Sequence, residues 1–336
     1  MMENILKSET ENLNELKTAS DTKAADTKAA DTKIVLEPEP DFAGFRIDKY
    51  IAEELSDYSR SYLSGLISNG KITVSDKPVK ASYKLREGDI IHLSIPAPEM
   101  PEQIIPENIP LDIVYEDSDI IIVNKPQGMV VHPAAGNYSG TLVNALMYRY
   151  GEGLSTINGI IRPGIVHRID KNTSGLLVIC RNDKAHHALA EQFAVHSITR
   201  IYTAISYNYF SDDEITINKA IARDKKDRKK MAIDPSGRRA VTHVKVIERL
   251  KNNFSLINCR LETGRTHQIR VHLSSINHPI LGDDVYGPKK CPFNLSGQLL
   301  HAGTLGFIHP STNEYIEFNS ELPEYFINVL EKLRAE

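Results

Sequence analysis

The sequence predicts an α+β fold with a mixed sheet, because its strand and helix patterns do not alternate in the β-α-β rhythm of a parallel sheet. Apolar runs typical of strands occur at 120–123, 176–179, 202–206, 241–247 and 254–261. Helical spacing of apolar residues occurs at 185–196, 266–276 and 323–335. Several strands therefore follow one another without a helix between them, which disfavours a doubly wound parallel sheet.

Length and composition describe a globular chain of about two domains. Its 336 residues are 41% hydrophobic and 25% charged, which excludes a wholly disordered chain, a collagen and a coiled coil. No apolar run approaches the roughly 20 residues that span a bilayer, and the N-terminus lacks the apolar core of a secretory signal. The three cysteines form no Cys-x-x-Cys pair, which indicates a reducing cytoplasm rather than a disulfide framework.

Charge is unevenly distributed over the chain. The formal net charge is −4 over residues 1–40, zero over 41–95, −7 over 96–123 and +7 over 124–336. The basic part is consistent with a nucleic-acid partner, but a charge of that size over so long a segment is also common in proteins that bind none.

Four segments are expected. Residues 1–40 contain the repeat DTKAADTKAADTK, which has too little apolar surface to fold and predicts a disordered tail. Residues 41–95 form a small α+β module with helical spacing, the turn Asn69-Gly70 and two strands at 72–74 and 90–95. Residues 96–110 hold five prolines and only acidic charges, which predicts a stiff linker. Residues 111–336 form the large domain.

Basic residues are spread along the sequence of the small module, residues 41–95. By spacing alone this is a generic module with a solvated face. The runs FRIDKYIAEEL and SRSYLSGLISNGKITV, however, resemble the alpha-L RNA-binding domain of the S-four-like family. The resemblance implies that the two helices and the Gly-Lys turn face RNA phosphates, which position a protein without reading sequence. The expected contacts are Arg46, Lys49, Arg60 and Lys71.

Several kinds of site are not indicated. The sequence has no Gly-x-Gly-x-x-Gly and no Walker loop, so no nucleotide cofactor is expected. It has no His-Glu-x-x-His, and no acid lies at helical spacing from His267 or His272, so no metal site is expected. Both histidines are better explained by structural or RNA-facing roles.

Three polar stretches remain, and each allows two interpretations. Asp170, in RPGIVHRIDKNTSGLLVIC, is either a turn-former or a reactive carboxylate at the edge of an apolar strand. Tyr202, in RIYTAIS, is either a core strand tyrosine or a functional one. In RLETGRTHQIRVHL, Arg265 lies at a strand-to-helix break that can direct it into a cleft, and Thr266 can cap the helix.

Longer motifs carry a family resemblance. HRIDKNTSGLLV, RIYTA, LETGRTHQIRVHLSSINHPILGDDVYG and LHAGTLGFIHP resemble the RluA-type pseudouridine synthases. NKPQGMVVHPAAGNYSGTLVNAL and the basic stretch ARDKKDRKKMAIDPSGRRAVTHVKV resemble the RluD-like branch. The resemblance spans roughly residues 41–330. It implies a pseudouridine synthase fold, with a largely antiparallel mixed sheet around a central cleft.

The resemblance also implies roles for individual residues. Asp170 matches the catalytic aspartate, and Arg168 matches an arginine that fills the space left by the flipped uridine. Tyr202 matches the tyrosine that packs on that base. Arg265 is expected to pair with the aspartate, with Arg270 in reserve. Leu261 is expected at the pocket floor, and His167 among the RNA contacts.

The segment 223–230, RDKKDRKK, is either a solvated loop or a clamp on RNA phosphates. The candidate contacts in it are Lys225, Lys226, Lys229 and Lys230.

The expected function is therefore a cytoplasmic RNA isomerase that needs no cofactor or metal and acts as a monomer. The expected substrate is large-subunit ribosomal RNA, free or in an assembling subunit, at the helix sixty-nine stem-loop. The alternatives are a synthase acting on transfer RNA or another ribosomal site, and a non-catalytic RNA-binding factor in ribosome assembly. No membrane partner is expected.

Overall fold

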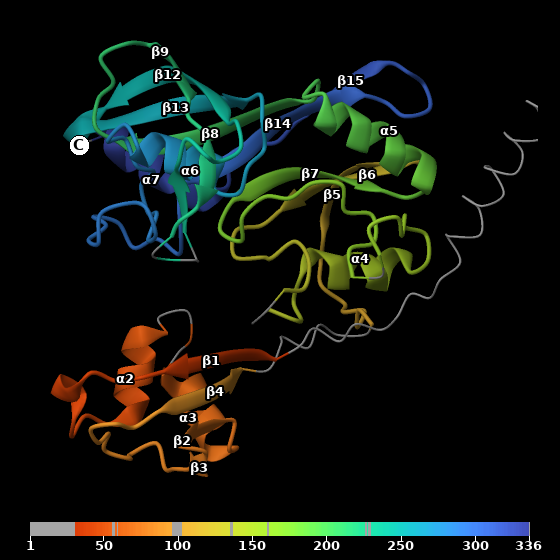
Figure 1. Cartoon of the computed structure of the whole chain (residues 1–336). Coiled ribbons are helices and arrows are strands. Elements are labelled where there is room, and N and C mark those ends of the chain that lie inside the picture. Colours follow the sequence, from red (N-terminus) through yellow and green to blue (C-terminus); the bar gives the residue numbers. More distant parts are fainter. Residues whose placement is uncertain are drawn as a thin grey trace, which may run out of the picture. The chain divides into compact units, whose positions relative to one another are not determined.

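A computed structural model of the chain describes residues 31–55, 58, 60–95, 103–134, 137–159, 161–225, 227 and 230–335 (Figure 1). The described residues form two compact units, one within Met1–Glu99 and the other within Met100–Glu336. Each unit has a hydrophobic core of its own. The predicted α+β class with largely antiparallel sheets is confirmed in both units.

The small unit packs two helices on a four-stranded sheet. The helices are α2 (Ile47–Glu54) and α3 (Arg60–Ser68), and a 3-10 turn, η1 (Pro40–Phe42), precedes them. The antiparallel sheet has the order β1 (Thr32–Leu36), β4 (Ile91–Ile95), β2 (Ile72–Val74), β3 (Lys77–Pro78). The apolar residues at helical spacing are buried against this sheet: Ile47, Tyr50, Ile51, Leu63, Leu66 and Ile67.

The predicted tail is wrong at its C-terminal end. Strand β1 pairs with β4 from Thr32 opposite Ile95 to Leu36 opposite Ile91. Ile34 and Leu36 pack against the core of the small unit, as alternation along a strand requires. The apolar run IVL after the repeat thus adds an edge strand to the module. Residues 1–30 lie outside the described part of the chain.

The large unit is built on one sheet of nine strands. Its path runs β5 (Asp112–Glu116), β6 (Ile120–Lys125), β7 (Ser174–Cys180), β14 (Leu300–Ile308), β8 (Thr199–Tyr207), β13 (Phe254–Leu261), β12 (Val241–Leu250), β9 (Glu214–Asn218). Strand β15 (Tyr315–Asn319) pairs with β14 off this path. A separate hairpin joins β10 (Ile221–Arg223) to β11 (Met231–Ile233). The strands predicted from the sequence are confirmed within a few residues.

The two halves of this sheet join through one short parallel contact. Only His301 and Ala302 of β14 pair with β7, opposite Ser174 and Gly175. A Cβ atom on Gly175 would lie 2.3 Å from the carbonyl oxygen of Ala302, and the φ of Gly175 is +115°. Only glycine fits such a close approach in that conformation. The N-terminal end of β7 is therefore held against the other half of the sheet.

Helices cover both faces of each half (Figure 1). Side chains of α4 (Leu142–Tyr150) and α5 (Asp183–Ala194) pack on opposite faces of β6 and β7. In the other half, α6 (Gln268–Ser274) packs on the face of β13 that carries Ile257 and Cys259. The last helix, α7 (Glu324–Ala335), packs on the face that carries Leu256, and η2 (Lys251–Asn253) is a short 3-10 turn between β12 and β13.

The prediction that residues 96–110 form a linker is also wrong at the C-terminal end of that segment. Ile104 is buried in the core of the large unit, and the side-chain amide of Asn144 donates to the carbonyl of Ile105 at 2.8 Å. Glu107 accepts a hydrogen bond from the backbone of Gly140. Residues 103–110 thus belong to the large unit, and residues 96–102 lie outside the described part. Within the described residues, we find no helix with the length and apolar character that a membrane crossing requires.

Candidate active site

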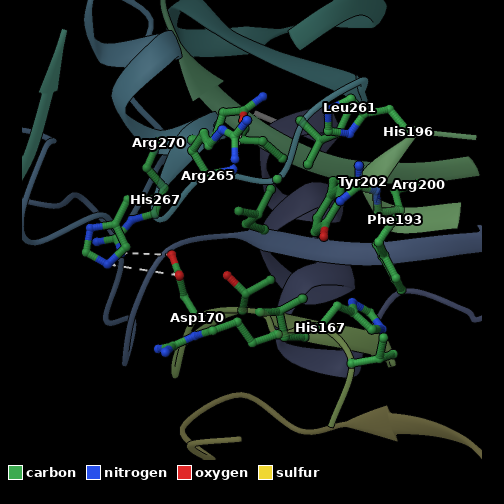
Figure 2. A pocket seen from close by; sticks show the side chains of 18 residues that line it. His167, Asp170, Phe193, His196, Arg200, Tyr202, Leu261, Arg265, His267 and Arg270 are labelled. Carbon is green, nitrogen blue, oxygen red and sulfur yellow. Dashed lines mark hydrogen bonds and ion pairs between the residues drawn. The ribbon is translucent and has the colours of Figure 1, made fainter. Parts of the chain in front are cut away.

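A pocket of about 260 Å³ opens where the two halves of the large sheet meet (Figure 2). Its walls come from the loop before β7, the C-terminal end of α5, strands β8, β13 and β14, and the start of α6. Segments far apart in the sequence thus meet around one cavity. The residues predicted from sequence that line it are His167, Arg168, Asp170, Tyr202, Leu261, Arg265 and Arg270.

Asp170 lies in a turn, as one of its two predicted interpretations requires, and its carboxylate also faces the pocket. Its carbonyl oxygen accepts the backbone N–H of Thr173 at 3.1 Å, which makes residues 170–173 a turn. Its carboxylate lines the pocket and remains 20% exposed. One carboxylate oxygen, Oδ2, lies 3.1 Å from Nη1 of Arg270. The turn therefore places a partly accessible carboxylate beside a fixed positive charge.

Arg270 is anchored by a second carboxylate. Its Nε and Nη2 donate to the two oxygens of Asp283 at 2.8 and 2.9 Å, and its guanidinium lies 5.1 Å from the ring centre of Tyr286. Burial favours the neutral form of Arg270, but Asp283 and Asp170 outweigh it and raise the pKa of the guanidinium. Bidentate pairing fixes the guanidinium plane, so Nη1 is held in place for Asp170.

The prediction that Arg265 pairs with Asp170 is wrong. The Nε of Arg265 donates to the carbonyl of Arg239 at 3.1 Å, and its backbone N–H donates to the side chain of Gln268. Arg265 precedes α6, whereas Arg270 lies inside the helix on the face that packs against the pocket. The reserve candidate is the one that pairs with the aspartate.

The expected cap of α6 is also different. The N-cap residue is His267 rather than Thr266, and it makes no side-chain cap hydrogen bond. His267 has a left-handed backbone, with φ of +53°. Such a conformation is uncommon for a residue with a side chain and indicates a locally imposed geometry. It directs the imidazole of His267 toward Asp170.

His267 is a pocket residue that the sequence interpretation did not assign to the site. Its Nε2 lies 4.0 Å from Oδ1 of Asp170, and its Nδ1 lies 2.8 Å from the hydroxyl of Tyr286. The same hydroxyl accepts the backbone N–H of Met231 at 2.8 Å. Tyr286 thus holds the Nδ1 side of the imidazole, and the Nε2 side faces Asp170. Burial lowers the pKa of His267, against the opposing charge of Asp170.

Tyr202 and Leu261 form the apolar part of the pocket wall. Tyr202 extends from β8 and Leu261 from the end of β13, and both belong to the core of the large unit. Burial raises the pKa of the Tyr202 phenol, so the ring stays neutral at ordinary pH. Figure 2 shows the Tyr202 ring on the side of the cavity away from Asp170. A flat ligand between them would contact both.

Arg168 and His167 differ although they are neighbours. Arg168 is exposed at the rim and donates no hydrogen bond to a described residue. His167 stacks on Phe193 with ring centres 4.6 Å apart, and its Nε2 accepts the backbone N–H of Val178. Burial lowers the pKa of His167 to about 3. His167 thus offers no charge to a phosphate, and it supports the loop that carries Asp170.

Lys125 is a second residue that the sequence interpretation missed. It is fully buried at the end of β6, and its Nζ donates to the carbonyl oxygens of Pro126, Met129 and Lys171. Lys171 follows Asp170 directly, so this lysine ties the Asp170 turn to β6. Burial lowers the pKa of Lys125 to about 7, with the charge of Asp170 opposing. The signal in the sequence was a lysine at the end of an apolar strand, in NKP.

The predicted RNA contacts of the small unit are partly paired. Arg46 and Arg60 both donate to Asp48, whose side chain is only 4% exposed. Arg46, followed by Arg60, lowers the pKa of Asp48 to about 2, although burial opposes them. Lys49 is exposed, and Lys71 lies 3.4 Å from Asp31. One acid thus holds two arginines side by side on this unit.

The basic stretch 223–230 belongs to the turn of the β10–β11 hairpin. Lys225 is highly exposed and lies 3.3 Å from Asp234, and Lys230 lies 3.9 Å from Asp227. Lys226 and Lys229 lie outside the described residues. The N–H of Met231 in this hairpin donates to the hydroxyl of Tyr286, which also contacts the pocket residue His267.

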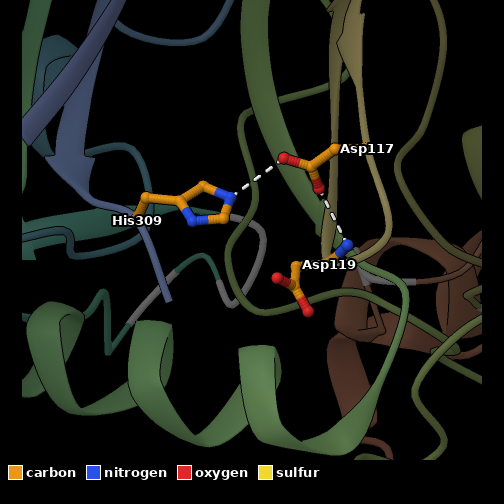
Figure 3. Close-up of side chains that lie close together, drawn as sticks. All are labelled: Asp117, Asp119 and His309. Carbon is orange, nitrogen blue, oxygen red and sulfur yellow. Dashed lines mark hydrogen bonds and ion pairs between the residues drawn. The ribbon is translucent and has the colours of Figure 1, made fainter. Parts of the chain in front are cut away.

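One cluster of possible metal ligands lies away from the pocket (Figure 3). Asp117, Asp119 and His309 offer atoms within 4.8 Å of one another. Nδ1 of His309 accepts the N–H groups of Ser311 and Thr312, so its Nε2 carries the proton and donates to Asp117 at 2.9 Å. No imidazole lone pair remains for a metal. The cluster joins the β5–β6 turn to the β14–β15 turn.

Comparison with known proteins agrees with this architecture. The family model described as RNA pseudouridylate synthase matches residues 119–275, which include Asp170, Tyr202 and Arg270. An uncharacterized RNA pseudouridine synthase of Bacillus subtilis is 50% identical over 86% of this chain and 94% of its own length. The chain belongs to the RNA pseudouridine synthase family. It is therefore an isomerase that acts on RNA, and its small unit matches the S4 domain model over residues 45–91.

Other relatives of this synthase carry more specific names. The ribosomal large subunit pseudouridine synthase D of Zymomonas mobilis is 49% identical over 84% of this chain and 91% of its own length. Its namesake in Neisseria meningitidis serogroup A is 42% identical over 88% and 80%. Among solved structures, the human RNA pseudouridylate synthase domain containing 1 superposes with a TM-score of 0.53 at 25% identity, over 68% of this chain and 97% of that one.

Proposed function

We propose that this synthase isomerises uridine to pseudouridine in large-subunit ribosomal RNA, at the helix sixty-nine stem-loop, with Asp170 as its catalytic residue. The observation that carries the proposal is the Asp170 carboxylate in the pocket, 3.1 Å from the anchored guanidinium of Arg270. The names of the Zymomonas and Neisseria relatives support large-subunit ribosomal RNA as the substrate.

The reaction uses only groups that the pocket and the RNA provide. The N1–C1′ bond of uridine breaks, uracil turns, and a C5–C1′ bond forms. The proton on C5 leaves and N1 gains one, so atoms and electrons balance without an oxidant, reductant or energy source. Asp170 serves as a nucleophile or as a base in this scheme. Both roles require an ionised carboxylate.

The target base must leave its stack to reach Asp170, at a cost of a few kcal/mol. Tyr202 provides a buried aromatic ring for the flipped base, worth about 1–3 kcal/mol of stacking. Leu261 closes the same wall with apolar surface. Arg168, exposed at the rim, is placed to enter the space that the base leaves. Together these contacts offset the cost of flipping.

RNA affinity is assigned mainly to the basic surfaces outside the pocket. Lys49, the Arg46–Asp48–Arg60 group and Lys71 offer positive charge on the small unit. Lys225 and Lys230 offer it on the β10–β11 hairpin. Such contacts to phosphates fix position and make binding sensitive to salt.

The experiment that tests the substrate is mapping of pseudouridine in unmodified large-subunit ribosomal RNA after incubation with the protein. The expected result is pseudouridine clustered in the helix sixty-nine stem-loop. Pseudouridine at another ribosomal site, or only on transfer RNA tested in parallel, would keep the chemistry and overturn the substrate. No pseudouridine on either RNA or on assembled subunits, with tight RNA binding, would favour a non-catalytic factor.

A further inference from the structure

Arg200 lies on the pocket wall but has no role in the proposal above. It precedes Tyr202 by two residues on β8, so the two side chains share one face of the strand, roughly 7 Å apart. Arg200 is only 7% exposed, although it lines the pocket. Figure 2 shows it beside Phe193 and Tyr202, on the side of the cavity away from Asp170.

The guanidinium of Arg200 is held in place by the groups around it. Its Nη2 donates to the carbonyl oxygen of Glu262 at 3.2 Å, and its Cζ lies 5.5 Å from the ring centre of Phe193. A Cβ atom on Gly264 would lie 2.6 Å from Nη1 of Arg200. The backbone of Gly264 is not left-handed, so this glycine leaves room for the guanidinium rather than serving a turn.

This buried charge lacks a counter-ion in the part of the chain that the structure describes. No carboxylate there forms an ion pair with Arg200, and its buried Nε has no hydrogen-bond partner among the same residues. Burial lowers the pKa of Arg200, but a guanidinium starts so high that it stays charged. Arg270, the other buried arginine of the pocket, has two carboxylates. An isolated buried ion is unfavourable unless a partner arrives.

We propose that Arg200 binds a backbone phosphate adjoining the target nucleotide, and so fixes the ribose between Tyr202 and Asp170. The inference rests on the proposed function. A buried positive charge is stabilised by an anion, and the anionic groups of RNA are its phosphates. The planar guanidinium of arginine can donate two parallel hydrogen bonds to a phosphate. The lining residues include four arginines and a single acid, Asp170, so the cavity is electropositive. His196, exposed on the same wall, is a second donor for that phosphate.

The position along β8 explains why a phosphate rather than the base is bound. Tyr202 offers a ring face to the base, and Arg200 lies further along the strand, away from the reacting centre. A nucleotide that stacks its base on Tyr202 has to place its sugar and an adjoining phosphate beyond that ring. Arg200 is thus a positioning residue, because it contacts the RNA backbone and not the reacting atoms.

The test pairs a protein change with an RNA change. The variants are Arg200→Met, which removes the charge, and Arg200→Lys, which keeps it. Arg260→Met, an exposed arginine on β13, is the matched control. The RNA is the stem-loop with one phosphate beside the target uridine replaced by an uncharged methylphosphonate, made once for the 5′ and once for the 3′ linkage. A 2′-O-methyl group before the linkage, also present in the charged reference, prevents self-cleavage.

Dissociation constants measured at fixed salt give the outcome. We expect one of the two neutral linkages to weaken wild-type binding about tenfold, and Arg200→Met to weaken binding of the charged RNA by a similar factor. The same neutral linkage should not weaken RNA binding by Arg200→Met any further. Arg200→Lys should recover part of the effect, and Arg260→Met should behave as wild type. A merely structural role would not produce this coupling.

Two results would overturn the inference. In the first, a neutral linkage weakens RNA binding by wild type and by Arg200→Met by the same factor. In the second, neither neutral linkage weakens RNA binding by wild type. Folding of each variant is checked by thermal unfolding, and Arg200→Lys carries the test if Arg200→Met is unfolded. Conversion of uridine in the unmodified stem-loop is measured separately. Its absence in wild type would count against the proposed function, whereas loss of the coupling alone would count against Arg200.

Discussion

Nη1 of Arg270 lies 3.1 Å from Oδ2 of Asp170, although the two residues are 100 positions apart in the chain. The same guanidinium holds both oxygens of Asp283, which is almost completely buried. Asp283 also accepts the backbone N–H groups of Val285 and Tyr286. The position of the proposed catalytic carboxylate thus depends on a second acid that never reaches the pocket.

Arg270→Leu is expected to destabilise the fold by about 3–5 kcal/mol, because it leaves Asp283 buried without its cation. Arg265→Leu, at the more accessible pocket arginine, should change the free energy of unfolding by less than about 0.5 kcal/mol. Urea unfolding of both variants provides the comparison. Equal losses in the two would contradict the assignment of Arg270 as the anchored partner.

Asp283→Asn tests whether Asp283 positions the Asp170–Arg270 pair without binding RNA itself. The amide retains one acceptor for Arg270 but lets the guanidinium shift, so single-turnover conversion at saturating RNA should slow by at least about tenfold. RNA affinity should stay within about twofold of wild type, since Asp283 faces no RNA. An unchanged rate would show that Asp283 does not position the pair.

His301 predicts a pH dependence of stability. Its ring is 1% exposed, with Nδ1 beside Ser174 and Nε2 beside Ser320, and burial lowers its pKa to about 4. The unfolded chain, with a histidine pKa near 6.5, binds this proton first as pH falls. Above about pH 6.5, protonation of His301 therefore leaves the free energy of unfolding unchanged. As the pH falls toward 4 the free energy of unfolding decreases, by about 2 kcal/mol between pH 7 and 5.

His301→Gln should reduce the fall in the free energy of unfolding between pH 7 and 5, whatever its effect at pH 7. Urea unfolding at both pH values, on wild type and variant, measures that difference. Parallel pH profiles would rule out His301 as a source of acid sensitivity.

The basic hairpin should set part of the salt dependence of RNA binding. Reversing the charge of Lys225, Lys226, Lys229 and Lys230 is expected to lower the slope of log affinity against log salt by roughly 0.7–0.9 for each phosphate that the hairpin no longer neutralises. Lys245→Glu, on β12 beside Glu214, is the control for a general loss of charge. An unchanged slope would leave the hairpin lysines as solvent-facing residues.

Local patterns predicted most of the secondary structure, because the spacing of apolar residues directly reflects which face is buried. The stripes of α2 and α3 and the runs of β6, β7, β8, β12 and β13 are examples. Several short or atypical segments were missed or misplaced, and no element was predicted at β5, β9, β15 or α4. β1 directly follows a polar repeat and was assigned to the tail, and residues 103–110 were assigned to the linker. β14 was not predicted because it carries two glycines that weaken its strand pattern.

The site was harder to predict than the fold, because its contacts join distant segments. Sequence spacing could not distinguish Arg265 from Arg270, since the choice depends on where α6 begins and which face it turns to the pocket. His267 was taken as structural or RNA-facing because its left-handed backbone cannot be read from neighbouring residues. Arg200 stood out only once its burial and missing counter-ion were known.

The most direct test of the account is single-turnover conversion of uridine by Asp170→Asn, measured beside its RNA affinity. The amide keeps the size of the carboxylate but can act neither as nucleophile nor as base. We expect no pseudouridine above background, with a dissociation constant for the stem-loop within about threefold of wild type. Turnover by Asp170→Asn at a substantial fraction of the wild-type rate would contradict the assignment of the chemistry to this carboxylate.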